Sequence, residues 1–277
     1  MNETIPQKTC AIFYVSDGTA ITAETVGQSL ITQFPQNIQF IQKRIPFVDN
    51  EAKAHLAADM IRQAKADFQP LVINTVVDIN LRKIIHAAGG LKLDPFNQLL
   101  RQIEENLGIE RSPGVGRAHG MYDSHSYNAR IDATNFALAH DDGMNLNLEQ
   151  AEVILLGVSR SGKTPTCLYL ALHYGIKAAN YPITDEDLEK MQLPKAVVKH
   201  KDKLFGLTID SHRLSQIRNR RRPDSRYANI KKCQKEISDA EALYHRYRIP
   251  FLNTTLTSIE EISGKILLEL NLNKRMF

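Results

Sequence analysis

Short apolar runs and helix-like patterns follow one another along the whole chain. Runs typical of buried strands occur at 10–16, 38–46 and 70–77, and again at 153–156 and 204–210. Between these runs, apolar residues recur every three or four positions, which is the spacing along one face of a helix. Strands that alternate with helices in this way are typical of α/β proteins. The pattern therefore predicts an α/β fold.

The remaining elements fit the same alternation. Asp94 and Pro95 open a helix that ends near Gly108, and Ser258 with Glu261 forms a capping box for the last helix. The pattern also predicts short strands at 176–181 and 249–255, and helices at 23–31, 50–67, 128–140, 185–191, 211–222 and 227–247.

Two stretches without periodicity suggest how the chain is divided. Residues 111–123 are rich in Gly and Pro and predict a long loop, and such loops in compact proteins are often functional or mobile. Residues 144–150 follow the helix at 128–140, and their pattern predicts a connecting segment. We therefore expect an N-terminal α/β domain over 1–150, with a role in target recognition, and a second α/β domain over 151–277.

Charge is distributed unevenly between these two parts. Residues 1–150 contain 13 Lys or Arg and 17 Asp or Glu, whereas residues 151–277 contain 22 and 14. Nine of the cations lie between Arg213 and Lys235, where Asp224 is the only acidic residue. Such a concentration attracts nucleotides, phosphoproteins or nucleic acids, and it is equally compatible with a solvated helix face.

The composition excludes several classes of protein. A hydrophobic content of 43% and a charged content of 24% are those of an ordinary globular protein. No apolar run approaches the roughly 18 residues of a membrane span, and the N-terminus has no targeting pattern. The three cysteines have no CxxC spacing, so neither a disulfide framework nor a zinc site is indicated. We expect a cytoplasmic protein that does not bind a membrane.

The strongest motif is GVSRSGKT, which fits the phosphate-loop pattern G-x-x-x-x-G-K-S/T between a strand and a helix. Glycines let the backbone N–H groups point at phosphate oxygens, and the helix N-terminus adds positive charge. Lys163 is expected to reach the terminal phosphates, and the Thr164 hydroxyl to bind Mg²⁺. The alternative is a tight glycine turn. The predicted nucleotide-binding residues are Gly157, Val158, Ser159, Arg160, Ser161, Gly162, Lys163 and Thr164.

An acidic residue that helps to hold the metal usually follows a second apolar strand in such enzymes. Asp210, at the end of the 204–210 run, is the best candidate, and Asp78 is a weaker one. Asp210 can equally be the N-cap of the helix that follows. Cys167, on the apolar side of the helix after the phosphate loop, is expected in the core.

The arginine-rich helix at 211–222 resembles the lid of small-molecule kinases, whose arginines neutralise the phosphoryl group in transfer. A nucleic-acid surface is the alternative, but no aromatic residues are interleaved with these arginines, which argues against stacking on bases. We therefore expect no nucleic-acid partner, and we predict that the domain at 151–277 is a P-loop, kinase-like domain that binds a nucleotide. The predicted catalytic residues are Lys163, Asp210 and Arg220.

Two further stretches have two interpretations each. The stretch from His140 to Gly143 could contain a general base, or could be a polar helix end. The stretch from Ser16 to Thr19 could be a second anion site at a helix N-terminus, or a simple N-cap turn.

Five blocks of this sequence resemble one known family and occur in its order. They are FYVSDGTAITAETVGQSL, RIDATNFALAHDDG, ILLGVSRSGKTPTCLYLA, NYPI and LFGLTIDSHRLSQIRNRRR, and together they span nearly the whole chain. The family is that of the regulatory proteins of phosphoenolpyruvate synthase and pyruvate, phosphate dikinase. The resemblance implies a bifunctional enzyme that phosphorylates a target threonine with ADP as donor. It further implies that the enzyme removes this phosphate with inorganic phosphate and releases pyrophosphate.

The resemblance is greatest to the branch that regulates phosphoenolpyruvate synthase (pyruvate, water dikinase), because the Gly-Lys-Thr of the loop is intact. The same chemistry on pyruvate, phosphate dikinase is the next alternative. An ATP-dependent small-molecule kinase and a nucleotide-gated binding protein are alternatives from other classes. The resemblance implies ADP, inorganic phosphate and a protein substrate, and homodimer formation stays open.

Overall fold

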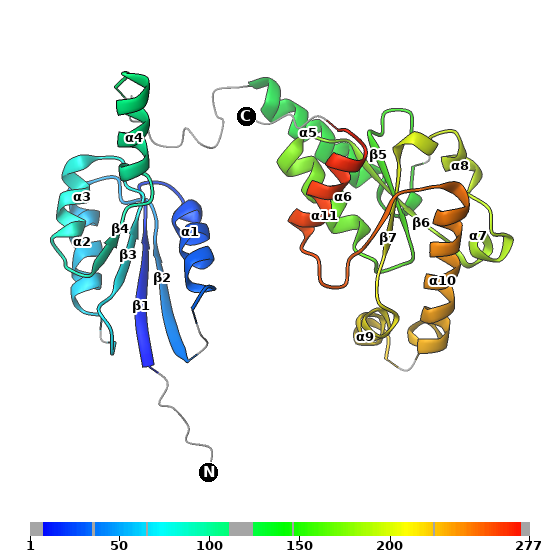
Figure 1. Ribbon diagram of the computed structural model, residues 1–277, viewed down its shortest axis with the longest axis horizontal. Coiled ribbons are helices and arrows are strands. Elements are labelled where there is room, and N and C mark those ends of the chain that lie inside the picture. The colour runs from blue at the N-terminus through cyan, green and yellow to red at the C-terminus, as the bar shows by residue number, and fades with distance from the viewer. Residues whose placement is uncertain are drawn as a thin grey trace, which may run out of the picture. The chain divides into compact units, whose positions relative to one another are not determined.

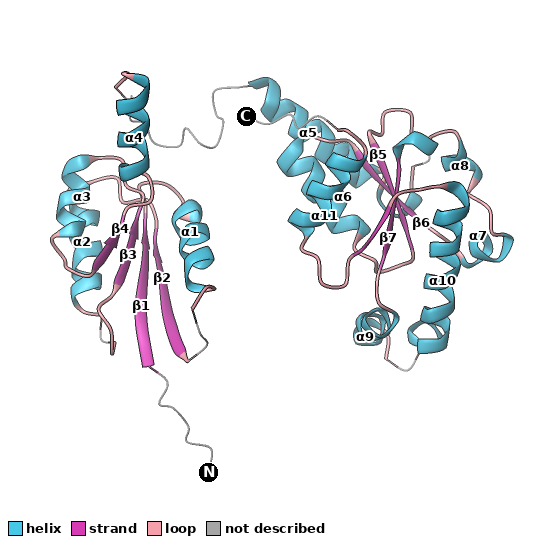
Figure 2. Ribbon diagram, in the orientation of Figure 1, coloured by secondary structure: helices cyan, strands magenta, loops and turns pink. Residues whose placement is uncertain are grey.

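The computed structural model describes residues 8–34, 37–64, 66–110, 124–145, 147–223 and 225–272. The loop predicted at 111–123 lies outside these residues. The chain divides into two compact units, Met1–His119 and Gly120–Phe277, each with a parallel sheet flanked by helices (Figure 1). The predicted α/β fold is therefore confirmed (Figure 2). The boundary that we expected near residue 150 falls inside the second unit.

The first unit has a sheet with the strand order β2-β1-β3-β4, and all pairs are parallel. Alternate residues of β1 face opposite sides of the sheet. Phe13 and Val15 pack with α2 and α3, whereas Ile12 and Tyr14 pack with α1. The elements are β1 (Lys8–Val15), α1 (Ile21–Ile31), β2 (Ile38–Ile45), α2 (Glu51–Arg62), β3 (Leu71–Asn74), α3 (Ile79–His86), β4 (Leu91–Leu93) and α4 (Asn97–Leu107).

Helix α4 begins at Asn97, shortly after the predicted start at Asp94 and Pro95, and ends where the sequence predicts, with Gly108 as a left-handed C-cap at φ of 66°. Leu99, Ile103 and Leu107 form an apolar stripe along this helix, and all three are exposed. The first unit therefore presents an apolar surface on a helix that the pattern shows as amphipathic.

The second unit repeats the same architecture with the strand order β6-β5-β7-β8, again with parallel pairs. Every residue of β5 is buried, because helices cover both faces of the sheet. The elements are α5 (Ser124–Ala139), β5 (Val153–Gly157), α6 (Lys163–Tyr174), β6 (Ala178–Pro182), α7 (Asp185–Lys190), α8 (Lys195–Val198), β7 (Leu204–Thr208), α9 (Ser211–Arg221), α10 (Ile230–Tyr247), β8 (Phe251–Asn253) and α11 (Ile259–Glu269).

Packing of α5 explains why the second unit begins before residue 150. Ala133 and Ala137 of α5 are buried in one core cluster with Leu170 and Ala171 of α6. The helix that the sequence assigns to the N-terminal domain therefore completes the core of the second unit. Cys167 lies in the same cluster and is buried, as predicted.

The predicted helices and strands of the described residues are present, and the structure adds a few short elements that were not predicted. The hydrophobic pattern does not predict α3, β4 or α8, which have eight, three and four residues. Elements of this length contain too few residues to show a period. The predicted capping box of α11 is present, with Ser258 and Glu261 bonded to each other's backbone N–H. None of the helices in the described ranges is long and apolar enough to cross a membrane.

Candidate active site

The loop at 157–164 joins the end of β5 to the start of α6, and its backbone requires both motif glycines. A Cβ on Gly157 would lie 2.5 Å from Oγ of Ser161 and 2.7 Å from the carbonyl oxygen of Leu207. Gly162 has a φ of +95°, a conformation that L side chains rarely adopt. The loop is thus folded tightly against β7 before α6 begins.

The start of α6 is arranged to accept an anion. Gly162 is the N-cap, and no side chain caps the first N–H groups of the helix. Such groups, together with the positive end of the helix dipole, attract negative charge. The Ser161 hydroxyl is buried and has no hydrogen-bond partner in the described part of the chain, although buried hydroxyls normally have one. The loop therefore offers several donors to phosphate oxygens.

Lys163 is a buried cation inside this loop, with 4% of its surface exposed. Its Nζ donates to the carbonyl oxygen of Val158 at 3.0 Å. Burial lowers the pKa of Lys163 from 10.5 to about 8, against the opposing effects of the Asp142 and Asp141 carboxylates. An ammonium held in this way carries its charge at neutral pH and can exchange its carbonyl partner for a phosphate oxygen.

Thr164 contacts a carboxylate that lies just after α5. Its hydroxyl donates to Oδ1 of Asp141 at 2.8 Å. The buried Asn180, on β6, donates from Nδ2 to the same oxygen at 2.5 Å and approaches Oγ1 of Thr164 at 3.0 Å. Asp142 accepts a weaker bond from Asn180 at 3.2 Å. Helix α5, strand β6 and helix α6 thus bring one carboxylate pair to the loop.

The stretch from His140 to Gly143 forms the polar end of α5, as one of its two interpretations predicts. His140 is buried, and its ring nitrogens lie 2.8 Å from the carbonyl oxygen of Phe136 and 3.0 Å from that of Asn147, so it fixes the end of α5. Asp141 and Asp142 are the members that face the loop. A general base among them stays a prediction, and the carboxylates are now its candidates.

The structure places the two other acidic candidates at helix N-termini. Asp210 is exposed and accepts the N–H of Arg213 at 2.9 Å as the N-cap of α9. Asp78, in the first unit, caps α3 by accepting the N–H groups of Asn80 and Leu81. The capping interpretation of Asp210 is confirmed, and a catalytic role for it stays a prediction. The carboxylate in contact with Thr164 is Asp141.

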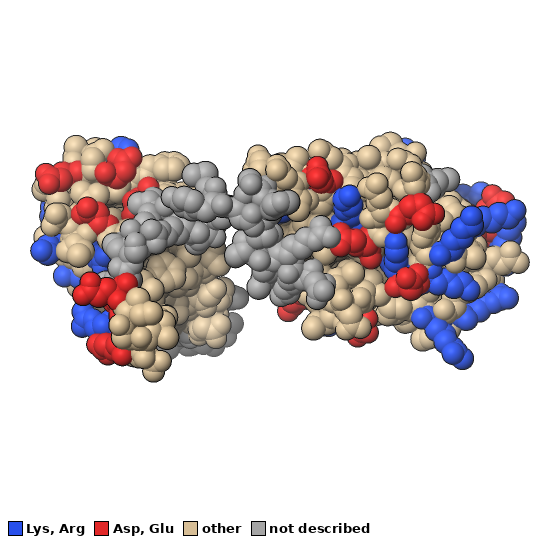
Figure 3. Space-filling view, turned by 90° about the horizontal axis from the view of Figure 1, so that it is seen from above, with Lys and Arg blue, Asp and Glu red and all other residues tan. Residues whose placement is uncertain are grey.

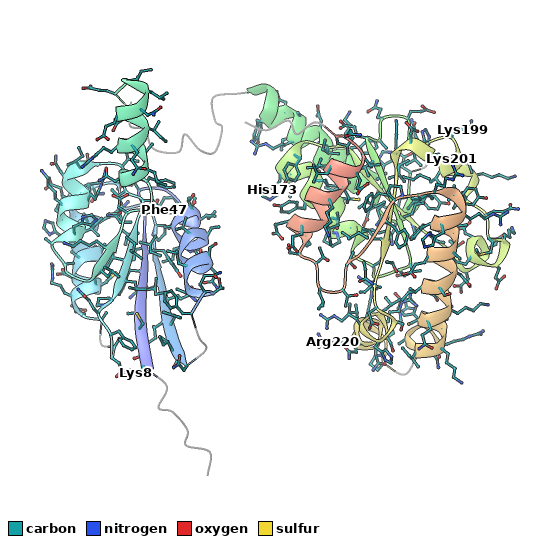
Figure 4. All side chains as sticks on the ribbon, viewed as in Figure 1. Lys8, Phe47, His173, Lys199, Lys201 and Arg220 are labelled. Atoms are coloured by element: carbon teal, nitrogen blue, oxygen red, sulfur yellow. The ribbon has the colours of Figure 1, made fainter. Side chains whose placement is uncertain are left out.

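The arginine-rich helix α9 has two kinds of arginine. Arg220, Arg221 and Arg222 are exposed, and Arg220 lies on the outside of α9 (Figure 4). Arg218 is 1% exposed and contacts the loop itself. Figure 3 shows Lys and Arg side chains gathered on the second unit, in agreement with the excess of cations in the sequence of residues 151–277.

The turn from Ser16 to Thr19 in the first unit does not cap α1 with a side chain. The N-cap is Ala20, in the left-handed conformation with φ of 63°, so the interpretation as an N-cap turn is wrong. Oγ of Ser16 instead accepts the N–H of Gly18 at 3.1 Å, and Asp17 accepts the N–H of Val77 at 2.7 Å. A second anion site at this turn stays a prediction.

Sequence reasoning missed the residues that surround the loop from other elements. Asn180, Tyr227 and Glu236 have no motif of their own and lie far from residues 157–164 in the sequence. The one available signal for Asn180 was the block NYPI, which begins with it and belongs to the family resemblance. No cluster of three or more His, Cys, Asp or Glu side chains that could hold a metal occurs among the described residues.

A parallel sheet with a glycine-rich, lysine-bearing loop after a central strand is typical of proteins that bind nucleotides, and enzymes that transfer phosphate groups are one class of them. A family model described as kinase/pyrophosphorylase matches residues 12–267. The chain therefore belongs to the kinase/pyrophosphorylase family, and the resemblance seen in the sequence is confirmed.

Curated relatives match along nearly the whole chain. A protein of Xanthomonas euvesicatoria pv. vesicatoria (strain 85-10) is 53% identical over 268 residues, which cover 96% of this chain and 98% of the relative. A protein of Stenotrophomonas maltophilia (strain R551-3) is 52% identical with the same coverage. Both relatives carry the name "Putative phosphoenolpyruvate synthase regulatory protein".

Proposed function

We propose that this protein is a bifunctional regulator of phosphoenolpyruvate synthase. In one direction it transfers the β-phosphate of ADP to a threonine of the synthase, and AMP leaves. In the other direction inorganic phosphate attacks that phosphothreonine, and pyrophosphate and the free threonine are formed. Membership in the kinase/pyrophosphorylase family and the names of the relatives support this proposal. The observation that carries it is the meeting of Lys163, Thr164 and Asp141 at one glycine-rich loop.

The loop would hold the phosphates through its backbone. The N–H groups at the start of α6 and the buried hydroxyl of Ser161 are free to donate to phosphate oxygens. Lys163 would leave the carbonyl oxygen of Val158 and donate to the phosphoryl group in transfer. This exchange would occur when the phosphates bind, so the ammonium would already be in place when charge develops in the transition state.

The oxygen atoms of Thr164 and Asp141, 2.8 Å apart, are the kind of ligand that Mg²⁺ prefers, and they fit a site that shares the ion with substrate phosphates. When bound, the ion would neutralise charge on the phosphates. Asn180 holds both oxygen-bearing side chains in place. We assign the base that receives the proton of the target threonine to the pair Asp141 and Asp142.

The removal direction brings two anions together and so demands the most positive charge. Inorganic phosphate must approach a phosphothreonine, and their repulsion must be offset by fixed cations. Lys163 lies inside the loop, and the exposed arginines of α9 follow β7, the strand paired with β5. We propose that Arg160 and Arg220 contribute this charge when both anions are present.

Two experiments with labelled nucleotides test the proposal. The protein is incubated with purified phosphoenolpyruvate synthase and ADP that carries ³²P at the β-phosphate, or ATP that carries it at the γ-phosphate. We expect label on a synthase threonine from ADP, and its release as pyrophosphate when unlabelled phosphate is added. Transfer from ATP to a metabolite would favour the small-molecule kinase instead. Label on pyruvate, phosphate dikinase but not on the synthase would favour the dikinase as target.

A further inference from the structure

Arg218 is the most enclosed charged side chain near the 157–164 loop, and it does not point to solvent. Its Nη2 donates to the carbonyl oxygen of Ser159 at 3.1 Å and to Oε2 of Glu236 at 2.6 Å. Its Nη1 donates to the carbonyl oxygen of Tyr227 at 3.1 Å. The guanidinium of Arg218 therefore bonds to other groups of the protein and is buried, whereas Arg220, Arg221 and Arg222 of the same region are exposed.

Tyr227 contacts both Arg218 and Ser159. Its ring lies over the Arg218 guanidinium, 4.2 Å from the ring centre, which is the geometry of a cation–π contact. Its hydroxyl lies 2.8 Å from Oγ of Ser159. Ser159 is therefore held twice, by its carbonyl oxygen through Arg218 and by its side chain through Tyr227. Glu236, on α10, balances the buried charge of Arg218 at 2.6 Å.

The loop needs such support at this point. Arg160, the next residue, has a φ of +77°, a left-handed conformation that is unfavourable for a residue with a Cβ. Unfavourable backbone of this kind persists only where the surroundings hold it, and it occurs often at ligand-binding sites. The anchors of Ser159 come from α9, α10 and the turn between them, all of which lie later in the chain than the loop.

We propose that Arg218, Tyr227 and Glu236 are positioning residues that hold Ser159 and Arg160 in the shape that receives the phosphates of a nucleoside diphosphate. They act through the loop and do not touch the ligand. This inference rests on the proposed function for the identity of the ligand, but the support of the loop itself does not depend on it. The buried arginine of α9 thereby differs in role from the exposed arginines at the end of the helix.

The test uses the full chain and separates the shape of the loop from binding. Tyr227→Phe removes one hydroxyl and keeps the ring over Arg218, and Tyr247→Phe on α10 is the matched control, because its ring faces Lys201 and Arg246 instead. Arg218→Met combined with Glu236→Leu removes both charges together, since one alone would leave an unpaired buried charge. Hydrogen exchange of the loop amides is measured without ligand, and the Kd for ADP by calorimetry.

We expect faster exchange in residues 157–164 and about threefold weaker ADP binding for Tyr227→Phe, at an unchanged melting temperature. The double variant should weaken ADP binding at least tenfold, and Tyr247→Phe should match wild type. Ser159→Ala added to Tyr227→Phe should cause no further loss, because both changes remove the same bond.

Unchanged exchange and unchanged Kd in Tyr227→Phe, or additive losses in the Ser159 pair, would overturn the inference even if the double variant fails to fold. If the wild-type protein does not bind ADP but Tyr227→Phe still exchanges its loop amides faster, the proposed function is refuted. The inference that Tyr227 supports the loop then still holds.

Discussion

The two units share one strand order but differ in the loop that follows their first strand. In the sheets β2-β1-β3-β4 and β6-β5-β7-β8, the first strand in sequence lies between the second and the third. After β1, the five residues 16–20 lead into α1, and Asp17 accepts the N–H of Val77. After β5, the five residues 158–162 lead into α6, and the ammonium of Lys163 is buried against the carbonyl oxygen of Val158. One topology thus presents a carboxylate in one unit and a buried cation in the other.

This difference shows that the sheet topology fixes where the connection after the first strand lies, whereas the residues of that connection determine what it can bind. The second unit combines its loop with the carboxylates of Asp141 and Asp142 and with the arginines of α9. The first unit instead exposes the apolar stripe of α4, and exposed apolar surface often marks a site of protein interaction. We therefore expect the second unit to carry the reaction and the first to recognise the target protein.

Separation of the units should have the largest effect. A fragment of residues 120–277 should still bind ADP, because it contains the loop and α5, but it should lose transfer to the synthase. A fragment of residues 151–277 should not fold, because it lacks Ala133 and Ala137 in the core. Circular dichroism and calorimetry check folding and binding, and labelled ADP checks transfer. Full phosphorylation of the synthase by the 120–277 fragment would contradict the division of roles.

Lys163→Ala should lower both the ADP-dependent and the phosphate-dependent rate by about 10²-fold or more. Loss of one preorganised charge contact to the transition state costs about 3 kcal/mol. Lys163→Arg should not restore the rates, because a planar guanidinium does not fit a loop shaped for an ammonium. Initial rates in both directions provide the measurement. A wild-type rate of phosphate removal in Lys163→Ala would show that the two reactions use different sites.

Asp141→Asn should lower both rates at least tenfold and more than Asp210→Asn does. Asp141 contacts Thr164 and Asn180, whereas Asp210 caps α9, where Asn is also a good N-cap. The two variants remove the same charge at different places, so each is the control of the other. An equal loss in both variants, measured at saturating ADP, would support the predicted catalytic role of Asp210.

The affinity for ADP should fall about tenfold between pH 7 and pH 9. Lys163 is charged below its pKa of about 8 and neutral above it, and a neutral amine attracts phosphate weakly. The unfolded chain keeps this proton up to about pH 10.5, so the contribution of Lys163 to stability rises with pH between about 8 and 10.5. Calorimetry in buffers of different ionisation enthalpy should show proton uptake on ADP binding near pH 8, and no uptake for Lys163→Ala.

The smallest effect is expected from the exposed arginines. Replacement of Arg220, Arg221 and Arg222 by Ala should lower both rates about three- to tenfold, with the greater loss in the phosphate-dependent direction. These side chains are exposed, so their contribution should also shrink at high salt. Rates in both directions at two ionic strengths test this. Equal rates in the triple variant and the wild type would make the end of α9 a solvated surface.

Local sequence was sufficient for the elements and for the loop. Buried strands, long amphipathic helices and a glycine-rich turn are each specified by residues close together in the chain, so periodicity and motif predicted α6, α9 and the residues 157–164. The role of Asp210 was undecided from the sequence, because a single acidic residue before a helix can be an N-cap or a metal ligand. The boundary near residue 150 was misplaced because a helix pattern does not say which core it joins.

Only the tertiary structure brought Asp141, Asn180, Arg218 and Glu236 to the loop. Each comes from a different helix, strand or turn, and their contacts depend on the crossover connections of the parallel sheet, which place distant segments beside the end of β5. Sequence spacing has no period that relates such residues. What the sequence determined alone was a loop able to hold phosphate, and what the fold decided was which carboxylates and which buried arginine surround it.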